Sequence, residues 1–164
     1  MAAARLDGAC HLLLWQPAGA GKALLQQFLR LKAAADIQHG DAKSTMDALR
    51  AALAAGHAVD IAGYSLQPAL TSELEQAVLD IAPPSRQVVW LEVAAREAPA
   101  LLPASSARIE AWRAAGHSVA AAAVPGPAFW QTQEIEDAPA LIDATLAALT
   151  ASAATAAAKT AVPA

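Results

Sequence analysis

The chain has 164 residues and a hydrophobic fraction of 56%, enough for one domain with a sizeable core. Alanine supplies much of that fraction and buries little area per residue, so the core depends on clusters of Leu, Val, Ile, Trp and Phe. The formal net charge is −4, and no run of lysine or arginine occurs. This charge pattern argues against nucleic acid or an anionic membrane surface as a partner.

Cysteine use and hydropathy predict a cytoplasmic location. Cys10 is the single cysteine, which excludes a disulfide within the chain and is typical of a reducing compartment. It fits a small core residue better than a nucleophile. No apolar run approaches the roughly 18 residues of a membrane span. The first residues make a poor signal peptide, because their apolar core is short and contains Asp7.

The first part of the chain predicts one strand followed by two helices. His11–Trp15 (HLLLW) is a short apolar run that predicts a buried strand and ends at Gln16-Pro17. Gly21–Ala35 has apolar residues at helical spacing and predicts an amphipathic helix. Ala42–Ala55 predicts a second helix, which Gly56 ends.

The middle of the chain predicts a short strand at Ala58–Ala62, a turn at Gly63 and a helix at Ala69–Leu79. Pro83-Pro84 then forms the clearest internal boundary, because neither residue continues a helix or a central strand.

The second half of the chain predicts two strands, each followed by a helix. Gln87–Val93 (QVVWLEV) is the strongest strand signal, and Ser105–Ala115 predicts a helix whose first turn starts at serine. Ser118–Val124 predicts the next strand and Ala138–Leu149 the last helix. The low-complexity Ala/Thr/Ser stretch 151–164 is predicted to be disordered.

Apolar strands joined by helical connections predict an α/β fold with a parallel sheet covered on both faces. Almost no chain precedes HLLLW, so we expect the sequence to begin inside a larger α/β fold.

Several segments resemble the exosortase A system-associated hydrolases of type 2, in the α/β-hydrolase superfamily. The similarity covers the chain to about Leu149, and PGPAFWQTQEIEDAP is its most specific part. The other similar segments are HLLLWQP, LLQQFLRLKAAAD, VDIAGYSLQPAL, VVWLEV and RAAGHSV.

The resemblance implies the C-terminal half of an α/β-hydrolase fold, with residues 1–20 and 84–150 as a partial core and residues 21–83 as a helical cap insertion. HLLLW, VVWLEV and SVAAAAV would be its sixth, seventh and eighth strands, and Gly21 to Pro83 its cap. Ala2–Asp7 would be the end of the helix behind the nucleophile elbow, with the elbow and the first five strands outside this chain. The implied activity is cleavage of small ester or acyl substrates in bacterial exopolysaccharide and protein-sorting systems.

The loop after the last predicted strand is the best candidate for a site, because open α/β sheets bind ligands at the carboxyl ends of their strands. Phe129 and Trp130 either line a ligand pocket there or belong to the core, and composition favours the core. Three acids, Glu134, Glu136 and Asp137, share this loop.

A hydrolase needs a nucleophile, a histidine and an acid. Glu97 follows the seventh strand and is the better acid candidate, whereas Glu92 lies within the strand end; a solvated loop glutamate is the alternative for Glu97. The loop after the last strand has no histidine, and His117 lies at the wrong end of that strand. The nucleophile and the base are therefore not identified.

Two motifs only approximate functional ones. Gly63-Tyr64-Ser65-Leu66-Gln67 nearly forms the G-x-S-x-G elbow, but Gln67 and Pro68 do not suit the sharp turn, which favours a cap turn instead. Pro17–Lys22 is similar to a phosphate loop, but Gln16 and Ala23 stand where glycine and a hydroxyl residue are needed.

No histidine pair has the spacing of a metal site, and no cofactor is predicted. The sequence thus predicts a partial α/β-hydrolase-fold protein that does not hydrolyse esters by itself. The alternative is a non-catalytic binding or scaffold protein on the same fold. The substrate and the oligomeric state stay open.

Overall fold

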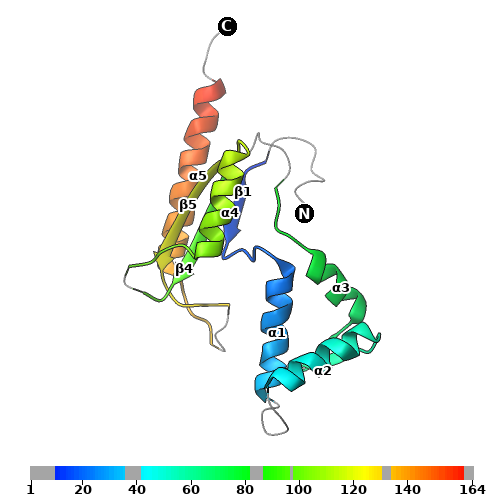
Figure 1. The fold of residues 1–164 in the computed structure, drawn as a ribbon. Coiled ribbons are helices and arrows are strands. Elements are labelled where there is room, and N and C mark those ends of the chain that lie inside the picture. Colours follow the sequence, from blue (N-terminus) through cyan, green and yellow to red (C-terminus); the bar gives the residue numbers. More distant parts are fainter. Residues whose placement is uncertain (1–9, 36–41, 82–86, 97, 131–133, 161–164) are drawn as a thin grey trace. The chain divides into compact units, whose positions relative to one another are not determined.

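The computed structural model describes residues 10–35, 42–81, 87–96, 98–130 and 134–160 (Figure 1). The chain divides into two compact units. Met1–Pro17 and Ile81–Ala164 form one of them, called here the sheet unit. Ala18–Asp80 form the other, called the helical unit.

The sheet unit contains a parallel sheet of three strands in the order β1-β4-β5. β1 spans Leu12–Trp15, β4 spans Gln87–Ala94 and β5 spans Ser118–Pro125. The order and direction that the three apolar runs predict are therefore confirmed. The coarse class, an α/β protein with a parallel sheet flanked by helices, is shown as well.

β4 is the central strand because it lies between β1 and β5, and helices on opposite sides of the sheet cover its two faces (Figure 1). Val89, Leu91 and Val93 alternate along it and pack with Leu141 of α5. Trp90 points to the other face and meets Trp112 of α4, with ring centroids 5.5 Å apart. A continuous apolar run is what a strand covered on both faces requires.

The two helices of the sheet unit differ from the predicted ranges. α4 spans Pro103–Ala114 and begins at a proline, so the predicted start at Ser105 is wrong and that serine is buried within the first turns. α5 spans Pro139–Thr160 and continues into the stretch that was predicted to be disordered. The physical reason is that alanine has the highest helix propensity and dominates this stretch.

The helical unit consists of three helices and a hairpin. Its elements are α1 (Gly21–Ala35), α2 (Ala42–Ala54), β2 (Val59–Ile61), β3 (Tyr64–Leu66) and α3 (Pro68–Gln76). The helices and the hairpin close on a shared core of buried residues: Leu25, Leu29, Leu53, Val59, Ile61 and Leu66. α1 has the predicted bounds, and α2 ends one residue earlier than predicted.

The second strand of the hairpin, β3, is the element that the sequence did not predict, whereas the strand at Ala58–Ala62 and the turn at Gly63 are present as β2 and its turn. β2 and β3 pair antiparallel through a two-residue turn at Ala62 and Gly63, whose φ angles are 49° and 84°. Two positive φ angles match the twist of a tight hairpin, and glycine adopts one readily. Tyr64–Leu66 is hard to recognise as a strand because only Leu66 of its three residues is buried.

Within the residues that the structure describes, no helix combines the length and the apolar character needed to cross a membrane.

Candidate functional site

The carboxyl edge of the parallel sheet is organised by Gln16, directly after β1. Its backbone N–H donates to the carbonyl of Leu91 over 2.8 Å, and its side-chain Oε1 accepts from the N–H of Val93 over 2.9 Å. Gln16 adopts a φ of 42°, which is uncommon for a residue with a side chain. The two hydrogen bonds hold this conformation and fix the end of β1 against β4.

The end of β5 is fixed to β4 in a similar way. The N–H of Gly126 donates to the carbonyl of Ala94 over 3.2 Å. A Cβ atom on Gly126 would come within 3.0 Å of Val93 Cγ1, so the close approach favours glycine. The three strand ends thus form one ordered edge, the place where open α/β sheets bind ligands.

Three aromatic rings gather at this edge. The Phe129 ring lies 6.3 Å from that of Trp15 and 5.2 Å from that of Trp130, in edge-to-face geometry in both cases. Trp15 Nε1 donates to Thr145 Oγ1 of α5 over 2.9 Å. Trp15 lies more than a hundred residues before Phe129, Trp130 and Thr145 in the sequence, and the parallel sheet brings it next to them.

The two predicted pocket residues have different surroundings. Phe129 packs against the core cluster of the α5-facing side of the sheet, whereas Trp130 is 43% exposed. Trp15 is 44% exposed, and sequence reasoning did not place it at the site. Its position at the end of the apolar run HLLLW was the signal that could have identified it. Contact of Phe129 or Trp130 with a ligand stays a prediction.

The structure places one of the two candidate acids. Glu97 lies outside the described residues. Glu92 is buried at 3% exposure, and its oxygens accept from Trp90 Nε1 over 3.0 Å and from the backbone N–H of Leu102 over 2.9 Å. Glu92 therefore joins β4 to the start of α4, and both of its oxygens are used in doing so.

The histidines of the described residues do not complete a catalytic group at this edge. The backbone N–H of His117 bonds to the carbonyl of Trp112 at the turn before β5, which is the amino end of that strand. His11 precedes β1, and His57 is exposed after α2. The loop acids Glu134, Glu136 and Asp137 are exposed. No group of three metal-binding side chains occurs among the described residues.

Ser65 lies in the middle of β3, in an extended strand of the hairpin. It is exposed, and its Oγ accepts from Gln67 Nε2 over 3.2 Å. A nucleophile elbow instead holds its serine in a strained turn between a strand and a helix. Ser65 thus has the environment of a solvent-facing hairpin residue.

The glycines of the phosphate-loop-like segment have a packing role in the helical unit. Gly21 donates its N–H to the carbonyl of Ala77 over 2.8 Å, and Leu79 donates to the carbonyl of Gly19 over 3.0 Å. A Cβ atom on Gly21 would lie 2.2 Å from the carbonyl oxygen of Leu74. The end of α3 therefore occupies the space next to this segment, where a phosphate loop would have its anion.

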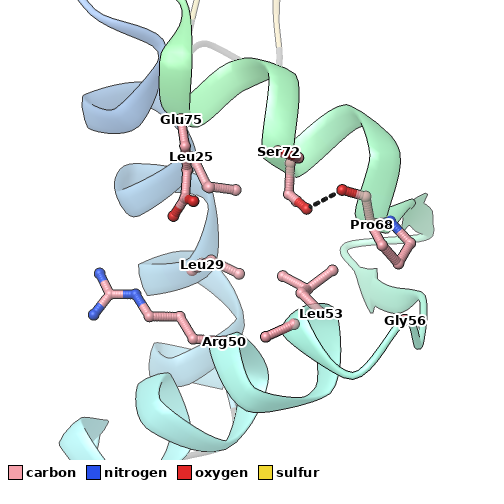
Figure 2. A pocket seen from close by; sticks show the side chains of 10 residues that line it. Leu25, Leu29, Arg50, Leu53, Gly56, Pro68, Ser72 and Glu75 are labelled. Carbon is pink, nitrogen blue, oxygen red and sulfur yellow. Dashed lines mark hydrogen bonds between the residues drawn. The ribbon is translucent and has the colours of Figure 1, made fainter.

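A cavity of about 510 Å³ opens between the helices of the helical unit (Figure 2). Its floor contains Leu25, Leu29 and Leu53, which are only 5%, 0% and 8% exposed. An occupant would gain little apolar contact from a floor that is already covered. Arg50 and Glu75 line both this cavity and a neighbouring one of about 210 Å³.

Comparison of this chain with protein-family models, curated proteins and solved structures finds no match. The case for a function therefore depends on the geometry of the described residues.

Proposed function

We propose that this chain is a partial α/β-hydrolase-type protein, related to the exosortase A system-associated hydrolases of type 2, that does not hydrolyse esters by itself. The supporting observation is the insertion of the helical unit directly after the carboxyl end of β1 in a β1-β4-β5 parallel sheet. A cap between the sixth and seventh strands of a hydrolase sheet has the same place in the chain.

The surroundings of the candidate groups support the absence of hydrolysis. Ester cleavage needs a hydroxyl whose proton a base removes, with an acid to orient that base. In the described part of the chain, Ser65 has Gln67 as its hydrogen-bond partner and no histidine. Glu92 already accepts two hydrogen bonds, which leaves it engaged in the core.

The cellular role that goes with this proposal is a cytoplasmic component of exopolysaccharide or protein-sorting systems. A catalytically complete relative would act on a small ester or acyl substrate through its own nucleophile and histidine.

A second candidate is a non-catalytic binding or scaffold protein on the same fold. The exposed Trp15 and Trp130 at the carboxyl edge of the sheet favour this candidate. Large aromatic side chains at a surface supply contact area for a partner, whether or not a reaction follows.

Turnover of a small activated ester by the full chain tests the proposal. We expect a rate no higher than that of buffer, because the Ser65 hydroxyl accepts from the Gln67 side chain and has no hydrogen bond to a histidine among the described residues. Substitution of Ser65 by Ala is the matched control and should leave the rate unchanged. Turnover that disappears in Ser65→Ala would identify Ser65 as a nucleophile and contradict the proposal.

A further inference from the structure

The cavity of the helical unit is bounded by three helices of one compact unit. Leu25 and Leu29 of α1 lie at its floor, Leu53 belongs to the wall from α2, and Ser72 to the wall from α3 (Figure 2). Every lining residue falls within Ala18–Asp80, so this unit forms the cavity by itself. Its volume of about 510 Å³ is within the range of sites for small molecules.

Two opposite charges border this cavity from different helices. Arg50 belongs to α2 and Glu75 to α3, and both residues also line the smaller cavity beside it. Both are exposed, and within the described residues neither side chain makes an ion pair or a hydrogen bond. Lys22 is a second cation, but it lines only the smaller cavity. The guanidinium of Arg50 and the carboxylate of Glu75 are therefore both available to a ligand.

The other groups of the cavity limit what the rest of a ligand can be. The floor of buried leucines adds little contact area, and it would leave a polar group that lay on it without a partner. Thr71 Oγ1 already donates to the carbonyl of Pro68 over 2.7 Å. The two charges thus decide which ligand is selected, and the part of the ligand above the floor should be apolar.

We propose that this cavity binds a free amino acid with an apolar side chain. The ligand carboxylate pairs with Arg50, whose guanidinium can donate two parallel hydrogen bonds to one carboxylate. The ligand ammonium pairs with Glu75, and the apolar side chain lies over the leucine floor. A ligand with a single charge is attracted by one of these residues and opposed by the other. This binding needs no ester cleavage, so the inference goes beyond the proposed function.

Calorimetric titration of the full chain with L-leucine and two analogues tests the charge selection. 4-Methylpentanoate is leucine without its amino group, and leucinamide has a neutral amide in place of the carboxylate. Each analogue loses one of the two charged hydrogen-bonding partners, so we expect each to bind at least roughly tenfold more weakly than leucine. Equal affinity for the three compounds, or no binding of L-leucine, would overturn the proposal.

Substitutions at the two charged residues test where the ligand lies. Glu75→Gln should remove the preference for leucine over 4-methylpentanoate, and Arg50→Gln should remove the preference for leucine over leucinamide, because each variant lacks the partner of the group that the analogue lacks. Glu73→Gln and Arg30→Gln are the matched controls, since both residues are exposed and line neither cavity, and both variants should keep the two preferences. Preferences that survive in Glu75→Gln and Arg50→Gln would refute this site.

Discussion

The sheet unit and the helical unit achieve stability in different ways. The sheet unit concentrates its packing on β4, six of whose residues are buried in succession. The helical unit shares a core among short amphipathic elements and a backbone contact at Gly21. All 4 tryptophans belong to the sheet unit, whereas the 1 tyrosine, Tyr64, belongs to the helical unit. Tryptophan emission therefore reports the sheet unit alone, and far-UV circular dichroism reports the helices of both units.

Trp90→Ala should give the largest loss of stability, and it should act on the sheet unit. Trp90 is 1% exposed, packs on Trp112 and donates to Glu92. We expect a loss of about 4 kcal/mol in the free energy of unfolding, from a large cavity and a lost hydrogen-bond donor. The tryptophan transition in urea should shift strongly, while the dichroism keeps a component from the helical unit. A single common transition for both signals would show that the units do not unfold separately.

Gly21→Ala should act on the helical unit instead. The new Cβ would lie 2.2 Å from the Leu74 carbonyl, so the end of α3 must move, at a cost of about 3 kcal/mol. Gly56→Ala is the control, because a Cβ there meets no atom within 4 Å and only the φ of 87° is strained. That control should cost about 1 kcal/mol. Equal destabilisation by the two substitutions, read by dichroism, would contradict the close approach at Gly21.

Glu92→Ala should cost about 2 kcal/mol in the sheet unit, because it leaves the N–H groups of Trp90 and Leu102 without their acceptor. Glu110→Ala removes an exposed ion pair with Arg113 and should cost at most about 0.5 kcal/mol. Thermal unfolding followed by tryptophan emission compares the two variants. A Glu92→Ala variant as stable as Glu110→Ala would show that Glu92 has no structural role.

Ala62→Asn should give the smallest change, and in the opposite direction. Ala62 has a φ of 49° in the hairpin turn, where asparagine before glycine is preferred. We expect the helical unit to gain about 0.5 kcal/mol, because asparagine tolerates a positive φ better than alanine does. Chemical denaturation followed by dichroism measures this change, and a loss of stability would argue against the turn geometry.

The sequence predicts the elements whose pattern is local. The apolar run QVVWLEV and the helical spacing in Gly21–Ala35 each indicate one element, and the strand order follows from their helical connections. The predicted bounds fail at Ser105 and at Leu149, since the helices there begin at a proline and continue through alanine. Local propensity decides both ends.

The candidate site was less predictable because its contacts join distant residues. Two hydrogen bonds, from Trp15 to Thr145 and from Val93 to Gln16, depend on how the strands are aligned in the sheet. A local sequence pattern does not predict that alignment. The burial of Glu92 depends on Trp90 beside it and on the start of α4. Gly21 belongs to a segment that only approximates a phosphate loop, and its packing against the end of α3 is not visible in the sequence.

Reaction of the full chain with a serine-directed phosphonate, followed by intact mass measurement, tests the central claim most directly. We expect an unmodified mass, because the Ser65 hydroxyl is in a solvent-facing hairpin strand and has no histidine partner among the described residues. One phosphonate adduct per chain, located at Ser65 and lost in Ser65→Ala, would contradict the claim that this chain lacks a nucleophile.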